Sequence, residues 1–230
     1  QNLPVLRDLP TFAALHASLS TLPAIQVHAF RVAHLLGGYW GALADRVADG
    51  QAPADAQVRR LLRELRRSTV HALSAALVDA ASARNAMASA WSAWRAGHRA
   101  ETRLVHGGTV TVESHHGNTW RKTAWMAAPA AALLALRGDP RAARDFRCCV
   151  ELLMLSSQCL DDAQDEHEDR ARHGRSVAEA LGVPVAGLAH AGAHLAWHAA
   201  HHALRTGFDD LSEGLFEHAA RVLARSVEGD

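Results

Sequence analysis

The most acidic stretch of this 230-residue chain, residues 158–170, reads Gln-Cys-Leu-Asp-Asp-Ala-Gln-Asp-Glu-His-Glu-Asp-Arg. On a helix, Asp161 and Asp165 lie one turn apart, and Asp162 lies over Gln158. Carboxylates this close repel each other, and a divalent cation removes that cost. Oxygen ligands on an open face suit Mg²⁺, which commonly bridges protein carboxylates to substrate phosphates. The stretch predicts a Mg²⁺ and diphosphate site held by Asp161, Asp162 and Asp165, with a solvated helix end as the alternative.

A second carboxylate pair at helical spacing, Asp45 and Asp49, occurs in the segment Leu-Ala-Asp-Arg-Val-Ala-Asp-Gly at residues 43–50. One interpretation is a second metal-binding edge. The other is an ordinary exposed helix end in which Arg46 pairs with either aspartate. Taken alone, the segment favours the exposed helix end.

Two further features could serve an anionic, apolar substrate. Lys122 is the only lysine among 24 basic residues, and it precedes the apolar segment 124–136. A compact ammonium at the mouth of a buried helix suits an anion. Trp91 and Trp94 fall at helical spacing with His98, and a tryptophan stripe of this kind is more typical of a core than of a pocket.

The elements that would position these residues are helices throughout. Alanine, leucine and arginine dominate, and apolar residues recur at helical spacing, so we expect an all-α, single-domain helical bundle of about eight helices over residues 1–230. The expected helices cover residues 10–20, 24–48, 54–80, 83–104, 112–137, 139–172, 176–205 and 208–226. Residues 109–112 follow a Gly-Gly pair and are expected to form a loop.

Composition excludes several classes of function. Lys+Arg and Asp+Glu both number 24, so the chain has no basic footprint for nucleic acid and no polybasic patch for a membrane. No apolar run reaches eighteen residues, which argues against stable membrane insertion. The three cysteines form neither a disulfide framework nor a zinc spacing, and they indicate a reduced, cytoplasmic protein. Hydrolase and nucleotide-binding motifs are absent from the sequence.

From about residue 113 onward, the order of motifs resembles the second half of trans-isoprenyl diphosphate synthases, members of the class I isoprenoid synthase superfamily. The family's Lys-Thr pair corresponds to residues 122–123, its Gln-x-x-Asp-Asp-x-x-Asp motif to residues 158–165, and its following Gly-Lys to Gly174-Arg175. Residues 97–101, Gly-His-Arg-Ala-Glu, are similar to its Gly-Gln-x-x-Asp pattern. Residues 43–50 are a weaker echo of its first aspartate-rich motif, Leu-His-Asp-Asp-x-x-Asp-Gly.

The resemblance implies the isoprenoid synthase fold, a homodimer, and Mg²⁺-dependent ionisation of an allylic prenyl diphosphate with release of diphosphate. It implies catalytic roles for Asp161, Asp162 and Lys122. It also gives two longer sets of residues. The substrate-binding set is Lys122, Arg175, Gln158, His98, Trp91 and Trp94, and the metal-binding set is Asp161, Asp162, Asp165, Asp45 and Asp49.

The departures from the family pattern are equally informative. Arg46 replaces the middle aspartate of the first motif, and Gln-Ala-Pro at residues 51–53 replaces the arginine pair that follows it. Ordinary elongation with isopentenyl diphosphate is therefore not expected. We expect a terpene synthase-like outcome, cyclisation or proton loss. The alternatives are a prenyltransferase with a non-isopentenyl acceptor, and a non-catalytic subunit of a prenyl diphosphate synthase, which Arg46 favours.

Overall fold

The computed structural model describes residues 22–105, 109–136 and 138–228 and shows an all-α domain. The helix expected at residues 10–20 lies outside these ranges. The described residues form nine helices and no strand, and residues 109–111 are a loop, as expected. The helices are α3 (Ala24–Ala48), α4 (Ala56–Leu77), α5 (Ala80–Val105), α6 (Val112–Leu136), α7 (Pro140–Gln164), α8 (Glu166–His173), α9 (Val177–Leu181), α10 (Val185–Arg205) and α11 (Asp209–Glu228).

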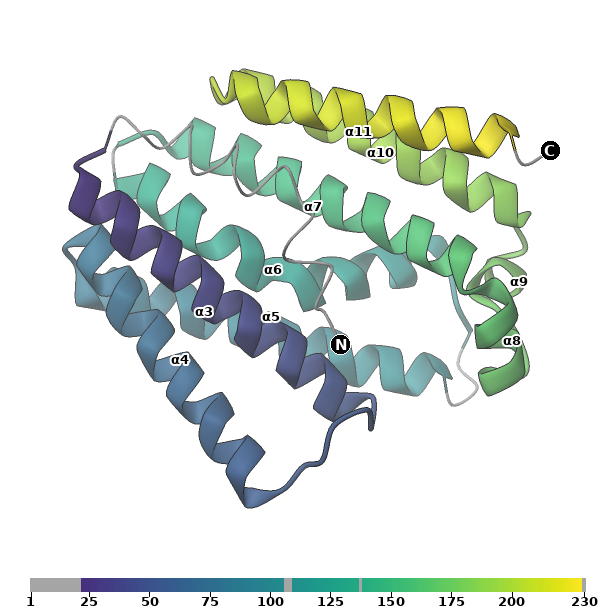
Figure 1. Ribbon diagram of the computed structural model, residues 1–230, viewed down its shortest axis with the longest axis horizontal. Helices are drawn as coiled ribbons and strands as arrows, with labels where there is room; N and C mark the ends of the chain where they lie inside the picture. The colour runs from purple at the N-terminus through teal and green to yellow at the C-terminus, as the bar shows by residue number, and fades with distance from the viewer. Residues whose placement is uncertain (1–21, 106–108, 137, 229–230) are drawn as a thin grey trace.

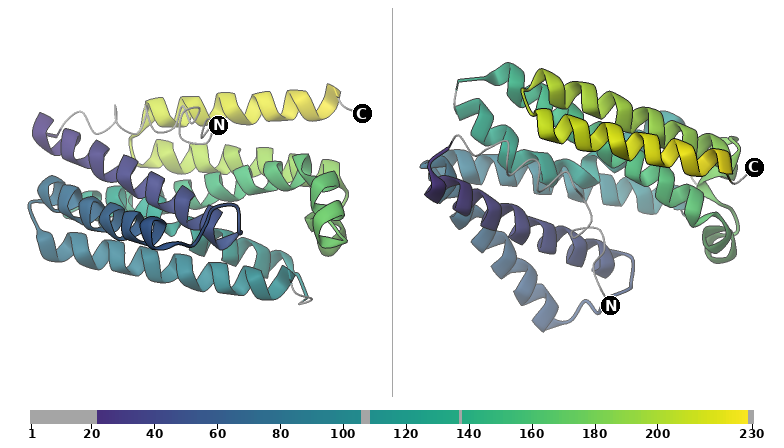
Figure 2. Two further views of the ribbon diagram at one scale, coloured as in Figure 1. Left: turned by 60° about the horizontal axis from the view of Figure 1, so that its bottom comes forward. Right: turned by 45° about the horizontal axis from the view of Figure 1, so that its top comes forward.

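Helix α6 lies at the centre of the arrangement (Figure 1). It packs against α5 on one side and α7 on the other, and it also contacts α3 and α4, which pack against each other. The α10–α11 pair runs along α7 at the edge of the molecule, as both views in Figure 2 show. The sequence explains the central position, because residues 124–136 are apolar on every face and a helix of that kind must be buried.

The core fills the space between α3, α4, α5, α6 and α7. Phe30, Leu73, Met87 and Phe146 are fully buried, and each contributes about 1.5–3 kcal/mol by leaving water. Trp125 of α6 lies directly against Gly41 of α3, where any side chain would collide with its ring. The absence of a side chain at this glycine therefore permits the close approach of α3 and α6.

The expectation of one helix over residues 139–172 is wrong. Helix α7 ends at Gln164, and α8 begins at Glu166 after a single non-helical residue, Asp165. The turn brings Arg170 to Glu179 at the start of α9, at 2.5 Å, while Arg170 also contacts Glu166 at 2.6 Å. The pair with Glu166 lies within α8, whereas the pair with Glu179 links α8 to α9. Arg170 is exposed, and exposed pairs of this kind contribute little to stability.

The single helix expected over residues 176–205 is also wrong, since it divides into α9 and α10. Ser176 begins α9 with a capping box, and Gly182 ends it with a φ of 69°. Pro184 then precedes the first residue of α10. Likewise, the helix expected to run to residue 80 ends at Leu77, because Val78 is left-handed and Asp79 caps the start of α5.

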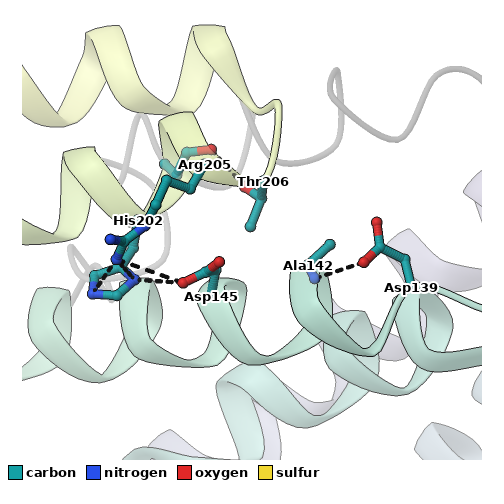
Figure 3. Close-up of polar contacts among 7 residues, drawn as sticks. Asp139, Ala142, Asp145, His202, Arg205 and Thr206 are labelled. Carbon is teal, nitrogen blue, oxygen red and sulfur yellow. Dashed lines mark hydrogen bonds and ion pairs between the residues drawn. The ribbon is translucent and has the colours of Figure 1, made fainter.

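A polar contact joins α7 to α10 at the end of the bundle where α7 begins (Figure 3). Asp145 Oδ1 lies 3.0 Å from His202 Nδ1 and 3.5 Å from the Arg205 guanidinium. On the preceding turn, Asp139 Oδ1 accepts a hydrogen bond of 2.8 Å from the Ala142 backbone N–H and caps α7. These contacts fix the register of α10 on α7.

The cysteines and the apolarity of the helices were also considered in the sequence. All three cysteines are free, with Cys149 and Cys159 buried and Cys148 half-buried. Within the described ranges, none of the helices has the length and apolarity that a bilayer crossing requires.

Candidate functional site

The residues predicted to do chemistry gather at one end of the bundle. Helices α3, α5 and α7 end there, and α4 and α6 begin there (Figure 1). This end therefore receives Asp45 from α3, Trp94 and His98 from α5, Lys122 from α6 and the carboxylates of α7. The antiparallel order of the helices allows side chains far apart in the sequence to meet, such as Asp45 and Trp94, which are 49 positions apart.

The carboxylates of α7 and α8 form a close group around Asp161. Asp161 is exposed, but the protein packed beside it removes part of its hydration and so raises its pKa, and the negative charges of Asp165, Asp162 and Asp169 raise it further. Lys122 acts in the opposite direction and lowers this pKa, which places the ammonium within electrostatic reach of the group. The four carboxylates are therefore within electrostatic reach of one another, while their role in a metal site stays a prediction.

Asp162 is the one buried member of this group, with 5% of its surface exposed. Its Oδ1 accepts a hydrogen bond of 2.8 Å from Gln158 Nε2, which confirms that these two side chains meet. Its Oδ2 lies 3.1 Å from His115 Nε2 in an ion-pair contact that is not aligned as a hydrogen bond. His115 was missed from the sequence, although its seven-residue spacing from Lys122 puts both on one face of α6.

The donor set suits Mg²⁺ in its chemistry. Within the described ranges, however, no group of three or more His, Cys, Asp or Glu side chains is arranged to hold a metal ion. Asp162 is buried and only its Oδ1 has a hydrogen-bond partner, whereas Asp161 and Asp165 are exposed. Because Mg²⁺ is commonly held by one or two protein carboxylates together with substrate phosphates and water, Asp161 and Asp165 fit this ion, with Asp162 behind them.

The chain matches no protein-family model, no curated protein and no solved structure. The resemblance to isoprenoid synthases therefore stays a prediction from the motifs. Support for a function must come from the positions of the side chains in the structure.

The first acidic segment contributes Asp45 to a row of polar and aromatic side chains. Asp45 Oδ1 accepts a hydrogen bond of 2.8 Å from Trp94 Nε1. The Trp94 ring stacks on His98, with ring centres 5.5 Å apart and planes 4° apart. Asp49 follows α3 as an exposed residue. The structure therefore joins three of the predicted residues, Asp45, Trp94 and His98, in one line.

A close contact between α5 and α6 connects this row to Lys122. A methyl group on Gly97 would lie 2.9 Å from the Asn118 carbonyl oxygen and 3.0 Å from the Lys122 backbone nitrogen. The backbone of α5 thus rests directly on α6 at the residue before His98. Arg175, the remaining predicted substrate ligand, is exposed between α8 and α9.

An apolar groove of about 790 Å³ lies between α5, α6 and α7. Its floor is formed by small residues of α6, including Ala124, Ala128 and Ala132. Trp120 and Glu151 lie on its lining and share a hydrogen bond, while burial raises the pKa of Glu151. On α7, helical spacing continues the face of Glu151 toward Asp162, so the groove shares a helix face with the carboxylate group.

Proposed function

We propose that this protein is a class I terpene synthase-like enzyme with the isoprenoid synthase fold. It ionises an allylic prenyl diphosphate, releases diphosphate, and lets the carbocation cyclise or lose a proton. The observation that carries the proposal is the carboxylate group around Asp161, with Lys122 in its field, on a helix that also lines a large apolar groove.

The roles of the polar residues follow from their charge and exposure. Asp161 and Asp165 would hold Mg²⁺, which when bound supplies positive charge to the departing diphosphate. Lys122 donates charge-assisted hydrogen bonds to the diphosphate oxygens. Gln158 and His115 hold Asp162 in place behind the exposed carboxylates, so the geometry gives Asp162 a positioning role.

The groove supplies room for the hydrocarbon. At roughly 30 Å³ for each carbon, the volume share of a water molecule in the liquid, a fifteen-carbon chain needs about 450 Å³. The groove of about 790 Å³ is large enough. The Trp120 ring on its lining is suited to stabilise an allylic cation through its face. If a non-isopentenyl acceptor captured the carbocation before it cyclised or lost a proton, the same site would act as a prenyltransferase.

A non-catalytic relative is the second candidate, and a specific observation favours it. Asp45 already accepts a hydrogen bond from Trp94, and Asp162 accepts one from Gln158, so one carboxylate of each acidic motif has a partner within the protein. Thermal unfolding discriminates the two candidates. A catalytic site is stabilised when Mg²⁺ and pyrophosphate are added together, and hardly by either alone, whereas a non-catalytic subunit shows no joint shift.

The function is tested with the double variant Asp161→Ala/Asp165→Ala. Diphosphate release from geranyl, farnesyl or geranylgeranyl diphosphate in the presence of Mg²⁺ should be abolished. Asp209→Ala/Asp210→Ala is the matched control, because it removes two exposed carboxylates from the first turn of α11 and should leave turnover unchanged. Equal turnover in all three proteins would reject the proposed roles of Asp161 and Asp165.

A further inference from the structure

A second, smaller cavity of about 260 Å³ lies between α3, α4 and α5. Three tryptophans line it, Trp40 from α3 and Trp91 and Trp94 from α5. The Trp40 ring centre lies 5.8 Å from that of Trp91 and 5.1 Å from that of Trp94, so the three indoles form one continuous aromatic wall. The Trp40 ring is inclined by 53° to that of Trp91 and by 71° to that of Trp94, so the wall is angled. Aromatic walls suit either an apolar molecule or a cation.

Three arginines line the same cavity, Arg63 and Arg66 from α4 and Arg95 from α5. The Arg66 guanidinium lies 4.2 Å above the centre of the Trp91 ring. Within the described ranges, none of the three arginines has a carboxylate partner. Burial lowers the pKa of Arg66, and the positive charge of Arg95 lowers it further. Arg66 is half-buried and Arg63 and Arg95 are exposed, so the lining of the cavity carries positive charge, which favours an anion over a cation.

A buried donor adds to this picture. Trp91 is 5% exposed, and its indole nitrogen is buried without a hydrogen-bond partner. A buried N–H without an acceptor costs about 1–3 kcal/mol relative to a satisfied one. Trp91 is thus a cavity-lining residue whose ring is covered by a cation and whose donor is unused.

We propose that this cavity is a binding site for a small organic anion, with an apolar body against the tryptophans and an anionic oxygen group at the arginines. Guanidinium groups match the planar oxygen pairs of carboxylates and the oxygens of phosphates. At roughly 30 Å³ per heavy atom, the cavity accommodates a body of about nine heavy atoms. The cavity shares Trp94 with the row formed by Asp45, Trp94 and His98, but none of the carboxylates of α7 lines it, so binding there does not depend on the proposed reaction.

The test is a titration of the whole protein with small anions, in which tryptophan fluorescence and calorimetry monitor binding. Benzyl phosphate and phenylacetate are the probes, because each joins a body of the right size to a different anionic head. Benzyl alcohol supplies the body without the charge, and inorganic phosphate supplies the charge without the body. We expect saturable binding with one-to-one stoichiometry for at least one probe, and binding at least about tenfold weaker for both partial molecules.

Variants locate the binding in the cavity. Arg66→Gln and Arg95→Gln should each weaken probe binding by about tenfold, the effect of losing one charge-assisted hydrogen bond. Arg67→Gln is the matched control, because the Arg67 side chain is 76% exposed and contacts Glu64 outside the cavity. It should change binding by less than about twofold. Circular dichroism and thermal unfolding of each variant establish that it is folded.

Several results would overturn the site. Absence of saturable binding by either probe would do so, as would equal losses in the Arg66, Arg95 and Arg67 variants, since nonspecific attraction to α4 depends on charge alone. Binding to phosphatidylglycerol vesicles that is weakened equally by all three variants would instead identify α4 as a lipid-binding face. Weakening confined to Arg66→Gln and Arg95→Gln supports the cavity.

Discussion

Replacing Gly97 by alanine tests whether the contact between α5 and α6 positions Lys122. The added methyl would lie 2.8 Å from Arg121 Cβ, 2.9 Å from the Asn118 carbonyl oxygen and 3.0 Å from the Lys122 backbone nitrogen. Two of these three atoms belong to the backbone of α6, so they cannot move aside as the end of a side chain would. The two helices must separate, and overpacking of this kind costs about 1–3 kcal/mol.

The cost of the collision at Gly97 is best measured by comparison with the same substitution at a second glycine. Gly214 is also within a helix, α11, but a methyl there would meet nothing within 4 Å. Each substitution gains about 0.8–1 kcal/mol because alanine favours a helix more than glycine does. We therefore expect Gly214→Ala to raise the free energy of unfolding by about 1 kcal/mol, and Gly97→Ala to lie about 1–3 kcal/mol below Gly214→Ala.

Urea unfolding, monitored by circular dichroism, measures the free energy of unfolding of both variants. The reasoning is refuted if Gly97→Ala is as stable as Gly214→Ala, because the helices would then accommodate the methyl without cost. A second readout addresses function. Displacement of the Lys122 backbone should lower the rate of diphosphate release by Gly97→Ala, whereas Gly214→Ala should retain the wild-type rate.

The pKa shifts give two further predictions. The pKa of Asp161 is raised above the ordinary value of 3.8, so the fold binds this proton more tightly than the unfolded chain does, and stability falls as the pH rises through the raised pKa. Asp161→Asn should therefore increase the free energy of unfolding at pH 7, and the gain should vanish as the pH approaches 3.8. Urea unfolding of both proteins at pH 7 and pH 4.5 measures this gain. A lower free energy of unfolding for the variant at pH 7 would contradict the prediction. Burial raises the pKa of Cys149 to about 12 and that of Cys159 to about 11, so at pH 8 iodoacetamide should leave both unmodified in the folded protein and modify all three cysteines in urea. Mass spectrometry checks the second prediction, and equally fast labelling of Cys149 with and without urea would show that it is not buried.

Helix boundaries were predictable where the chain itself marks them. Residues 24–48 and 112–136 were placed correctly to within one position, because proline precedes the first and the Gly-Gly pair precedes the second. The break at Asp165 was missed, since neither glycine nor proline marks it in the sequence. A contact between Arg170 and Glu179 accompanies the break, and contacts between elements are not visible in a periodic pattern.

In the candidate site, too, some contacts could be predicted from the sequence and others could not. Contacts within one helix were predictable, such as Gln158 with Asp162, because four residues make one turn. Contacts between helices were not. Asp45 and Trp94 are 49 residues apart, and their hydrogen bond depends on how α3 and α5 are rotated against each other. The cavity between α3, α4 and α5 escaped prediction for this reason, although its tryptophans and arginines stand out in the sequence.

Both acidic segments lie at the carboxyl-terminal ends of helices: Asp45 and Asp161 are in the last turns of α3 and α7, and Asp49 and Asp165 directly follow these helices. The aligned peptide dipoles give this end of a helix a partial negative charge, so acidic residues there are repelled by the helix itself as well as by one another. Asp165 is a partial exception, because it also precedes the first residue of α8, where the partial charge is positive. Each helix end holds electrostatic free energy that a cation would release, and the macrodipoles of α3 and α7 would add to its binding.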